Sequence, residues 1–161
     1  MLLSALECGA QKFDIDRTTI KDFDLKRYMG RWYEIARFDH SFERNMEYCE
    51  AFYAIQNDGM ISVTNTGINT KTDKRKTSYG KAKKGGEPGQ LRVSFFWIFY
   101  SDYNILALDE DYEWALVGSK SPKYLWILSR TRQLDATTKH KICDIAQRRG
   151  YDTRDLIWVK Q

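Results

Sequence analysis

A chain of 161 residues is long enough for one domain with a sizeable hydrophobic core. Charged residues make up 30% of it and the mean hydropathy is −0.61, which argues against an integral membrane protein and does not indicate disorder. The net charge of +4 favours anionic partners only weakly and does not indicate a nucleic-acid-binding protein. Aromatic residues, at 14%, are numerous enough that large rings are expected to fill or line the interior.

The N-terminal stretch MLLSALECGAQ contains a short apolar run followed by Cys8, with no basic residue before the run. We interpret residues 1–23 as a tail, either the remnant of a secretory or lipoprotein signal or a leader foreign to the domain. Glu7 directly before Cys8 is a poor cleavage context, because small residues are expected there. The domain itself is predicted to span residues 24–161.

Short segments with alternating polar and apolar residues recur from residue 31 onward, separated by turn residues. Their spacing, roughly 8 to 12 residues, is typical of an antiparallel barrel or sandwich. The Asn57-Asp58-Gly59 sequence is a strong hairpin signal, because glycine accepts the positive φ that tight turns need. Strands in direct succession leave no room for the helices that parallel crossovers require. The predicted strands are 31–37, 48–55, 60–66, 77–84, 90–97, 103–109, 113–119 and 124–130.

A helix is predicted for residues 134–150, after the eight strands. Asp135 can cap its start, Ile142 belongs to an apolar stripe, and Gly150 ends it. A short strand at 155–160 follows. The predicted fold class is therefore all-β, an eight-stranded antiparallel up-and-down β-barrel with a C-terminal α-helix and a ninth strand. A barrel of about eight strands can hold one small ligand.

The stretch RVSFFWIFYSDY at 92–103 crowds six aromatic residues into its last nine positions. It is far shorter than the ~18 to 20 apolar residues that span a bilayer, so a transmembrane helix is excluded for it. Because side chains alternate between the two faces of a strand, Phe95 and Trp97 share one apolar face. We expect these two rings to line the inside of the barrel and residues 98–100 to form an apolar lip.

Three motifs resemble those of the lipocalin family, and more closely its bacterial lipocalin and apolipoprotein D branch. MGRWYEIARFDHSFER at 29–44 is similar to the G-x-W-Y signature of the first strand, YSDYNILALD at 100–109 to the second motif, and YLWILSRT at 124–131 to the third. The resemblance implies a barrel with one open end and a closed base, where the guanidinium of Arg130 stacks on Trp32. The residues that carry the structural motifs are Gly30, Trp32, Tyr33, Asp102 and Arg130.

A cavity for a hydrophobic ligand is the function that this resemblance implies. The resemblance to apolipoprotein D assigns part of the cavity wall, and the two-residue periodicity of the strands assigns the rest. Each of these residues could instead belong to a solid core, but so many rings beside a polar asparagine favour a lined cavity. The resemblance assigns Tyr53, Asn65, Phe95, Tyr103 and Trp126, and the periodicity adds Trp97, Trp114, Leu116 and Leu128.

Four loops, 38–47, 67–75, 98–102 and 119–123, are expected at the open end from the family topology. Together they combine apolar side chains with positive charge. A fatty acid or lysophospholipid requires this combination, because its chain is buried while its anionic head stays in water beside cations. An ordinary solvated hairpin is the simpler explanation of the KTDKRK sequence. The basic residues are Lys71, Lys74, Arg75, Lys76, Lys120 and Lys123.

The predicted function is binding and transport or storage of a small hydrophobic ligand, a fatty acid or lysophospholipid, at or near a bacterial membrane. The resemblance implies an exported protein, periplasmic or associated with the outer membrane, and lipid-anchored if Cys8 is modified. The alternative is an interaction module, in which an outward aromatic patch from Phe96 to Tyr100 serves dimerisation or docking on a membrane surface. We expect a monomer or homodimer without a cofactor and without a nucleic-acid partner.

Catalysis is not expected, because no Ser/His/Asp set, phosphate loop or pair of carboxylates stands out. Cys49 could act as a nucleophile only with a base in reach, and neither His40 nor His140 lies on a predicted inner face. Cys49 and Cys143 either form a disulfide or remain buried thiols. Two distant histidines and no CxxC spacing argue against a metal site. Glu34 is expected to be buried, with a structural hydrogen-bonding role.

Overall fold

The computed structural model describes residues 14–96 and 99–161, and the side chains of Phe96 and Phe99 lie outside the described set. Within these ranges nine antiparallel strands form a single sheet. The strands are β1 (Gly30–Phe38), β2 (Met46–Ile55), β3 (Ile61–Asn69), β4 (Lys74–Lys84), β5 (Gln90–Phe96), β6 (Phe99–Leu108), β7 (Trp114–Gly118), β8 (Leu125–Ser129) and β9 (Leu156–Trp158).

Strand β1 closes the sheet into a barrel. Strands β2 to β8 pair in sequence order, and β1 pairs with β2 through residues 30–33 and with β8 through residues 33–37. Beyond the last β2 partner, the short strand β9 takes over the same edge of β1, with Ala36 opposite Trp158. The predicted eight-stranded antiparallel barrel with a ninth strand is therefore confirmed.

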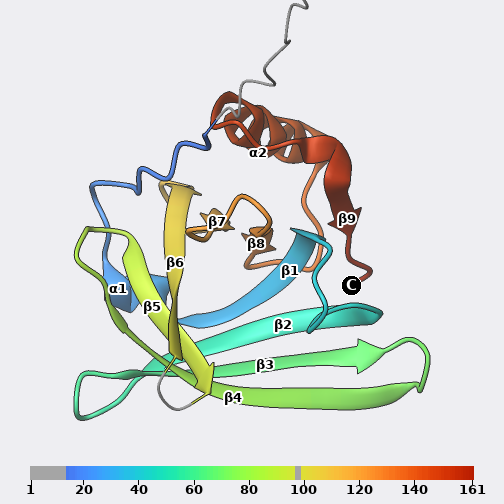
Figure 1. The fold of residues 1–161 in the computed structure, drawn as a ribbon, viewed down its shortest axis with the longest axis horizontal. Coiled ribbons are helices and arrows are strands. Elements are labelled where there is room, and N and C mark those ends of the chain that lie inside the picture. Colours follow the sequence, from blue (N-terminus) through green and yellow to red (C-terminus); the bar gives the residue numbers. More distant parts are fainter. Residues whose placement is uncertain (1–13, 97–98) are drawn as a thin grey trace, which may run out of the picture.

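In the part of the chain that the structure describes, the helices are α1 (Leu25–Tyr28), α2 (Ala136–Arg148) and the short 3-10 helix η1 (Thr153–Asp155). Helix α2, the predicted C-terminal helix, begins after Asp135, whose carboxylate accepts from the Thr138 N–H at 2.8 Å. It lies over the outside of the barrel, on the side away from β3 and β4 (Figure 1). Neither α-helix in the described ranges combines the length and apolar character needed to cross a membrane.

The short helix α1, which the sequence pattern does not predict, lies at the closed base of the barrel. Asp24 caps it by accepting from the N–H of Lys26. Its last residue, Tyr28, is fully buried and accepts a hydrogen bond at its carbonyl from the Trp32 indole N–H at 2.8 Å. Arg130 lies outside this pair, with its guanidinium carbon 3.7 Å from the centroid of the Trp32 ring. The base is thus sealed by stacked aromatic and guanidinium groups.

Buried apolar side chains form two separate clusters, one inside the barrel and one between the barrel and α2. Alternation along each strand sends successive residues to opposite clusters, so in β7 Ala115 and Val117 face inward while Trp114 and Leu116 face the helix. The inner cluster includes Tyr28, Trp32, Tyr53, Ile61, Val63, Ala82, Leu91, Ile105 and Leu128, and the outer cluster includes Ile35, Phe38, Leu106, Leu125, Ile127, Ile142 and Ala146.

The described part of the predicted N-terminal tail, residues 14–22, packs against the domain. Ile15 is buried in the outer cluster. The N–H of Ile20 donates to the carbonyl of Ile105 at 3.0 Å, and the N–H of Asp16 donates to the carbonyl of Arg149 at 2.8 Å. This segment therefore contributes to the core beneath α2 as well as connecting the chain to it.

Candidate functional site

The inside of the barrel changes from a solid base to a more accessible open end. Near the base, Trp32, Ile61 and Ile105 are fully buried. Toward the open end, where β5 ends and β8 begins, the inward-facing rings of Phe95 and Trp126 are only partly buried, although they belong to the same inner cluster. Solvent therefore reaches inward-facing aromatic side chains at the open end, whereas close packing at the base excludes solvent.

Three tyrosine hydroxyl groups form the floor of the accessible part. The hydroxyl of Tyr103 lies 2.6 Å from that of Tyr28 and 3.1 Å from that of Tyr53. Burial raises the pKa of Tyr53 to about 12, and it raises the pKa of Tyr28 and Tyr103 well above the ordinary value. The three rings therefore present neutral hydroxyl groups, which can donate and accept hydrogen bonds without charge.

Asn65 adds an amide group to this wall. It lies on β3 opposite Ala51 of β2, on the same face as the buried Val63. Its Oδ1 atom is buried and has no hydrogen-bond partner among the residues that the structure describes. A buried polar atom without a partner is rare, so a ligand atom or water is the natural counterpart of this amide.

Phe95 owes its position to a glycine on the neighbouring strand. A Cβ atom added to Gly80 of β4 would lie 2.8 Å from the Phe95 ring, closer than any real contact. The glycine thus leaves the space that the ring occupies. Toward the open end of the same strand, the inner face of β4 continues with Ser78, Lys76 and Lys74, which follow from the alternation that points Gly80 inward.

A cluster of charged side chains fills one side of the open end, and the sequence pattern did not predict it as a unit. A register shift in β1 directs both Ile35 and Ala36 to the outer cluster, so Arg37 joins Glu34 on the inside. Nη1 of Arg37 donates to Oε1 of Glu34 at 2.8 Å, and both side chains are more than nine-tenths buried. The predicted burial and hydrogen-bonding role of Glu34 are confirmed.

The loop between β1 and β2, residues 39–45, contributes the rest of this cluster. Oε2 of Glu43 accepts from the indole N–H of Trp126 at 3.0 Å and lies 2.6 Å from Nε2 of His40. Nη2 of Arg37 donates to the main-chain carbonyls of Glu43 at 2.7 Å and Met46 at 3.1 Å. The loop is therefore fastened to the inside of the barrel by a side chain and by its backbone.

The pKa values of the two carboxyl groups of this cluster shift in opposite directions. Burial, followed by the negative charge of Glu43, raises the pKa of Glu34 well above its usual value. Burial alone would raise the pKa of Glu43 too, but hydrogen bonds from His40, Glu34 and Trp126 outweigh it and lower that pKa. The two pKa shifts run in opposite directions, so a proton kept by the pair favours Glu34 over Glu43, and the guanidinium of Arg37 lies beside both as the nearest positive charge.

Five of the predicted cavity residues lie on the inner face of the barrel, as predicted. The strand register places Asn65 on the same face. Two others do not lie there, because the strand β7 has the opposite alternation from that expected. Trp114 and Leu116 face α2, and Nζ of Lys141 on that helix lies 5.6 Å from the Trp114 ring centroid. Trp97 lies outside the described residues. The inner-face residues are Tyr53, Phe95, Tyr103, Trp126 and Leu128.

The prediction that residues 98–100 form an apolar lip is wrong for Tyr100, whose side chain the structure describes. Tyr100 belongs to β6, and Nζ of Lys83 on β4 lies 4.3 Å from its ring centroid. Because Lys83 neighbours the inward-facing Ala82, its own side chain points outward, and so does the ring that it covers. Residues 97 and 98 lie outside the described set. The expected loop 67–75 is also shorter, since β3 and β4 leave only residues 70–73 between them.

The remaining motif residues have structural contacts. Gly30 has φ +95°, and a Cβ there would lie 3.4 Å from Nη1 of Arg130, so the glycine permits both the turn and the close approach. Asp102 forms an ion pair with the cross-strand Arg92, with Nε and Oδ1 3.3 Å apart. The guanidinium of Arg132 lies 4.7 Å from the centroid of Tyr33.

Both cysteines in the described ranges are free thiols, so the disulfide considered from the sequence is absent between them. Cys49 is buried inside the barrel, and Cys143 lies on α2 outside it. Burial, together with the negative charges of Glu34 and Glu43, raises the pKa of the Cys49 thiol far above its ordinary value. A thiol held in its neutral form is a poor nucleophile, which argues against the cysteine-dependent enzyme.

The expectation that no histidine faces the interior is wrong for His40. The 39–45 loop folds inward and buries this side chain, with its ring centroid 5.5 Å from that of Trp126. Strand periodicity cannot place a loop residue, so no sequence pattern predicts the position of His40. In residues 14–96 and 99–161 no group of three metal-ligating side chains is close enough to hold an ion.

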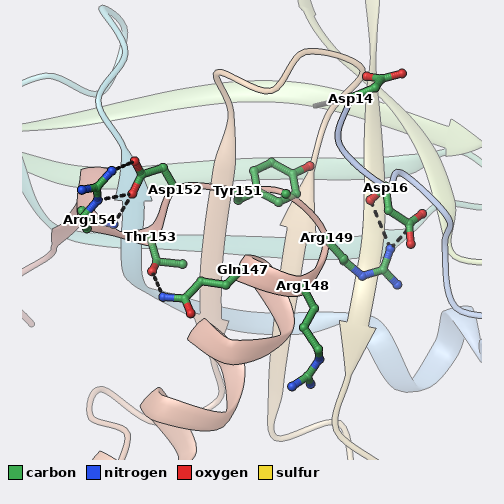
Figure 2. A pocket seen from close by; sticks show the side chains of 10 residues that line it. Asp14, Asp16, Gln147, Arg148, Arg149, Tyr151, Asp152, Thr153 and Arg154 are labelled. Atoms are coloured by element: carbon green, nitrogen blue, oxygen red, sulfur yellow. Dashed lines mark hydrogen bonds and ion pairs between the residues drawn. The ribbon is translucent and has the colours of Figure 1, made fainter. Parts of the chain in front are cut away.

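A separate hollow of about 630 Å³ lies outside the barrel, at the C-terminal end of α2 (Figure 2). Its charged side chains are largely paired with one another, since Arg154 contacts Asp152 at 2.6 Å and Arg149 contacts Asp16 at 3.6 Å. Arg149 also donates to the main-chain carbonyl of Leu106 at 2.7 Å. These contacts fasten the N-terminal segment to the helix, and the polar lining does not suit a hydrophobic ligand.

Comparisons with known proteins agree with the motifs and the barrel. The family model described as a lipocalin-like domain matches residues 23–161. The chain belongs to the lipocalin family. It is 47% identical over 146 residues to outer membrane lipoprotein Blc of Citrobacter freundii, a match that covers 89% of this chain and 82% of that protein. Apolipoprotein D of Mus musculus is 32% identical over 151 residues, covering 88% and 78% of the two chains.

A solved structure gives the same fold at low sequence identity. Insecticyanin from the tobacco hornworm Manduca sexta superposes with a TM-score of 0.76 at 19% identity, covering 92% of this chain and 86% of that one. The predicted bacterial lipocalin and apolipoprotein D branch is thus confirmed by the relatives, and the fold by the structure. Membership of this branch supports the binding of a small hydrophobic ligand as the general function.

Proposed function

We propose that this lipocalin binds a fatty acid or lysophospholipid, with the acyl chain inside the barrel and the anionic head at the open end. The observation that carries the proposal is the partial exposure of inward-facing rings, above all Phe95 and Trp126, over a fully buried base. In a solid barrel, inward side chains at this level would be covered as completely as Trp32 is. Rings that solvent reaches supply apolar surface that a ligand can cover.

The inner face of β4 supports an amphiphile with an anionic head. From base to open end it carries Ala82, Gly80, Ser78, Lys76 and Lys74, so it passes from apolar through small and polar to cationic. Both lysines are exposed beyond the packed part of the barrel. Exposed ion pairs contribute only ~0 to 1 kcal/mol each, so the lysines orient the head while burial of the chain supplies most of the affinity.

Burial of the chain is sufficient for useful affinity. Each methylene that leaves water contributes ~0.8 kcal/mol, so about 10 to 14 methylenes outweigh the loss of translational and rotational freedom and give micromolar binding or better. The protein acts by reversible sequestration in this proposal, without a chemical step. The raised pKa of the Cys49 thiol supports this, because it disfavours the thiolate that a nucleophile requires.

The names of the bacterial relatives support a location as well as a function. Outer membrane lipoprotein Blc is the name of relatives in Citrobacter freundii and Vibrio cholerae, which are 47% and 43% identical to this chain. We therefore place this lipocalin outside the cytoplasm, associated with the outer membrane and anchored by lipid. In that position the ligand would come from membrane lipids or their breakdown products.

Titration with a fluorescent fatty acid and with a lysophospholipid of the same chain length tests the proposal. Phe95→Asp and Trp126→Asp, which put charge on the inner face, should each abolish binding. Tyr79→Asp is the matched control, because Tyr79 is 75% exposed on the outside of β4. Binding that survives both inner variants, or no binding by the unchanged protein, would contradict the proposal. Self-association without lipid uptake would instead favour the alternative, an interaction module, for which Tyr100 supplies an outward ring.

A further inference from the structure

The 39–45 loop places a carboxylate of the protein itself inside the proposed ligand site. Glu43 reaches inward from this loop, and its Oε2 atom takes the indole N–H of Trp126 at 3.0 Å. Trp126 is one of the partly exposed inner rings on which the ligand proposal rests. Any ligand that covers Trp126 on this side therefore competes with Glu43 for space and for a hydrogen-bond donor.

The surroundings of Glu43 supply donors that are suited to a carboxyl oxygen. Nε2 of His40 lies 2.6 Å from the same Oε2 atom. Arg37, only 2% exposed, has an Nε atom that is buried and without a hydrogen-bond partner among the described side chains and backbone. A buried guanidinium N–H without an acceptor costs free energy. The Nε–H of Arg37 can therefore donate to one further oxygen atom.

Apolar and aromatic side chains surround these donors on the outer side. The His40 ring lies 3.9 Å from that of Phe42 and 5.6 Å from that of Tyr124, centroid to centroid. Phe42 is 57% exposed, so the loop carries a large apolar side chain into solvent at the open end. This arrangement offers an acyl group both contacts it needs, polar donors for its oxygen atoms and rings for its first methylenes.

We propose that Glu43 occupies, with its own carboxylate, the site for a carboxyl oxygen of the ligand, and that the 39–45 loop leaves the interior when an acyl acid or acyl ester enters. The inference rests on the proposed function, because it specifies how the ligand's polar end is bound. The shared chemistry is a carboxyl oxygen, which is the head of a fatty acid and the ester carbonyl of a lysophospholipid. The ligand oxygen takes over the Trp126 N–H and reaches the free Arg37 N–H.

A ligand oxygen can replace part of the contacts that hold the 39–45 loop inside the barrel. When Glu43 leaves, it loses the hydrogen bond from Trp126 and the close contact with His40, and the entering oxygen regains the bond from Trp126. The titratable groups around it are Glu34 and Arg37 on β1, His40 on the loop and Cys49 on β2. A ligand carboxylate that takes the place of the Glu43 carboxylate carries the same charge, so it meets the same donors without changing the net charge of the cluster.

Affinity measurements with three chain-matched probes test the exchange. The probes are a saturated fatty acid, its methyl ester and the alkyl chloride of the same length, each competing with a fluorescent lipid. Glu43→Ala removes the internal competitor, and we expect it to raise the affinity for the acid and the ester by about tenfold. Glu87→Ala, which removes an exposed carboxylate from the β4–β5 turn at the base, is the control and should change none of the affinities.

A second substitution in the Glu43→Ala background isolates the donor. Adding Trp126→Phe keeps a ring but removes the N–H, so it should lower the affinity for the acid and the ester by about 2- to 10-fold and leave the alkyl chloride within twofold. In the unchanged protein, hydrogen exchange of residues 39–45 should become faster when the acid is bound, because the loop has left its contacts.

The outcomes separate the two proposals. If none of the probes binds, the proposed lipid-binding function fails. If all three bind and neither substitution distinguishes the acid and ester from the chloride, the function stands and the carboxyl site is wrong. Slower exchange of the 39–45 loop on ligand binding would also overturn the inference, because it would show that the loop closes over the ligand rather than leaving.

Discussion

Arg130 lies flat against Trp32, with 3.7 Å between its guanidinium carbon and the centroid of the indole ring. The same guanidinium donates at 2.8 Å to the main-chain carbonyls of Arg31 and of Arg27. These contacts join β1, α1 and the end of β8 at the base. The pair therefore closes the barrel structurally, at the end opposite the proposed ligand site.

Replacement of Arg130 should lower stability without changing ligand specificity. We expect Arg130→Ala to reduce the free energy of unfolding by about 2 to 4 kcal/mol, because several hydrogen bonds and a cation–π contact are lost together. Arg130→Lys should recover less than half of this, since an ammonium cannot reproduce the planar fork. Urea denaturation measures both, and equal stability of the lysine variant and the unchanged protein would contradict the assignment.

Gly80 is predicted to control the position of the Phe95 ring. A side chain at Gly80 meets that ring at 2.8 Å, so Gly80→Val should destabilise the barrel by about 1 to 3 kcal/mol. Phe95→Ala in the same chain should relieve part of the strain, giving a double variant that is more stable than the sum of the single effects. At Gly86 the nearest atom to an added Cβ is 3.9 Å away, so Gly86→Val is the control. Additive effects of the pair would show that the contact is absent.

Leu116 should behave as a residue of the core beneath α2. It is fully buried in the cluster that contains Ile142 of the helix. Leu116→Ala is expected to cost about 2 to 5 kcal/mol of unfolding free energy, yet leave the affinity for a fatty acid within twofold. Calorimetry and titration of the same sample check both expectations. A large loss of affinity from a protein that remains folded would place Leu116 on the ligand side after all.

The Glu34–Glu43 pair predicts a pH dependence of stability with a defined sign. Burial raises the pKa of Glu34 in the folded state above its value in the unfolded chain, so the folded state holds a proton that the unfolded state has lost. Its contribution is fully present below the unfolded pKa and is lost as pH rises through the raised, folded pKa. Because Glu34→Gln does not titrate, the stability of the unchanged protein relative to this variant should fall as pH rises. A stability difference between the two proteins that stays constant from the unfolded pKa to the folded pKa of Glu34 would contradict the raised pKa.

Most of the fold follows from sequence patterns that act locally. Alternation and turn residues give the strands, and Asp135 and Gly150 bracket α2, because these signals depend on neighbours in the chain. Asn57-Asp58-Gly59 lies between β2 and β3, as the hairpin signal predicts. The helix α1 carries no such signal, since it is only one turn long and depends on the packing of Tyr28 against Trp32.

The candidate site is predictable only where a strand alternates without interruption. Phe95 and Trp126 follow the two-residue period and lie inside. In β7 every residue from Trp114 to Gly118 is buried, so the hydrophobic pattern does not tell which face is inner. Arg37 reaches the interior through a register shift. Glu43 reaches it from a loop, and no period describes either position.

The most direct test of the account is native mass spectrometry of freshly purified protein, followed by organic extraction of whatever is bound. We predict one lipid per chain, identified after extraction as a fatty acid or lysophospholipid, and lost from Phe95→Asp but retained by Tyr79→Asp. A mass that corresponds to the chain alone, unchanged after incubation with either class of lipid, would contradict the central claim that the open half of this barrel binds an acyl chain.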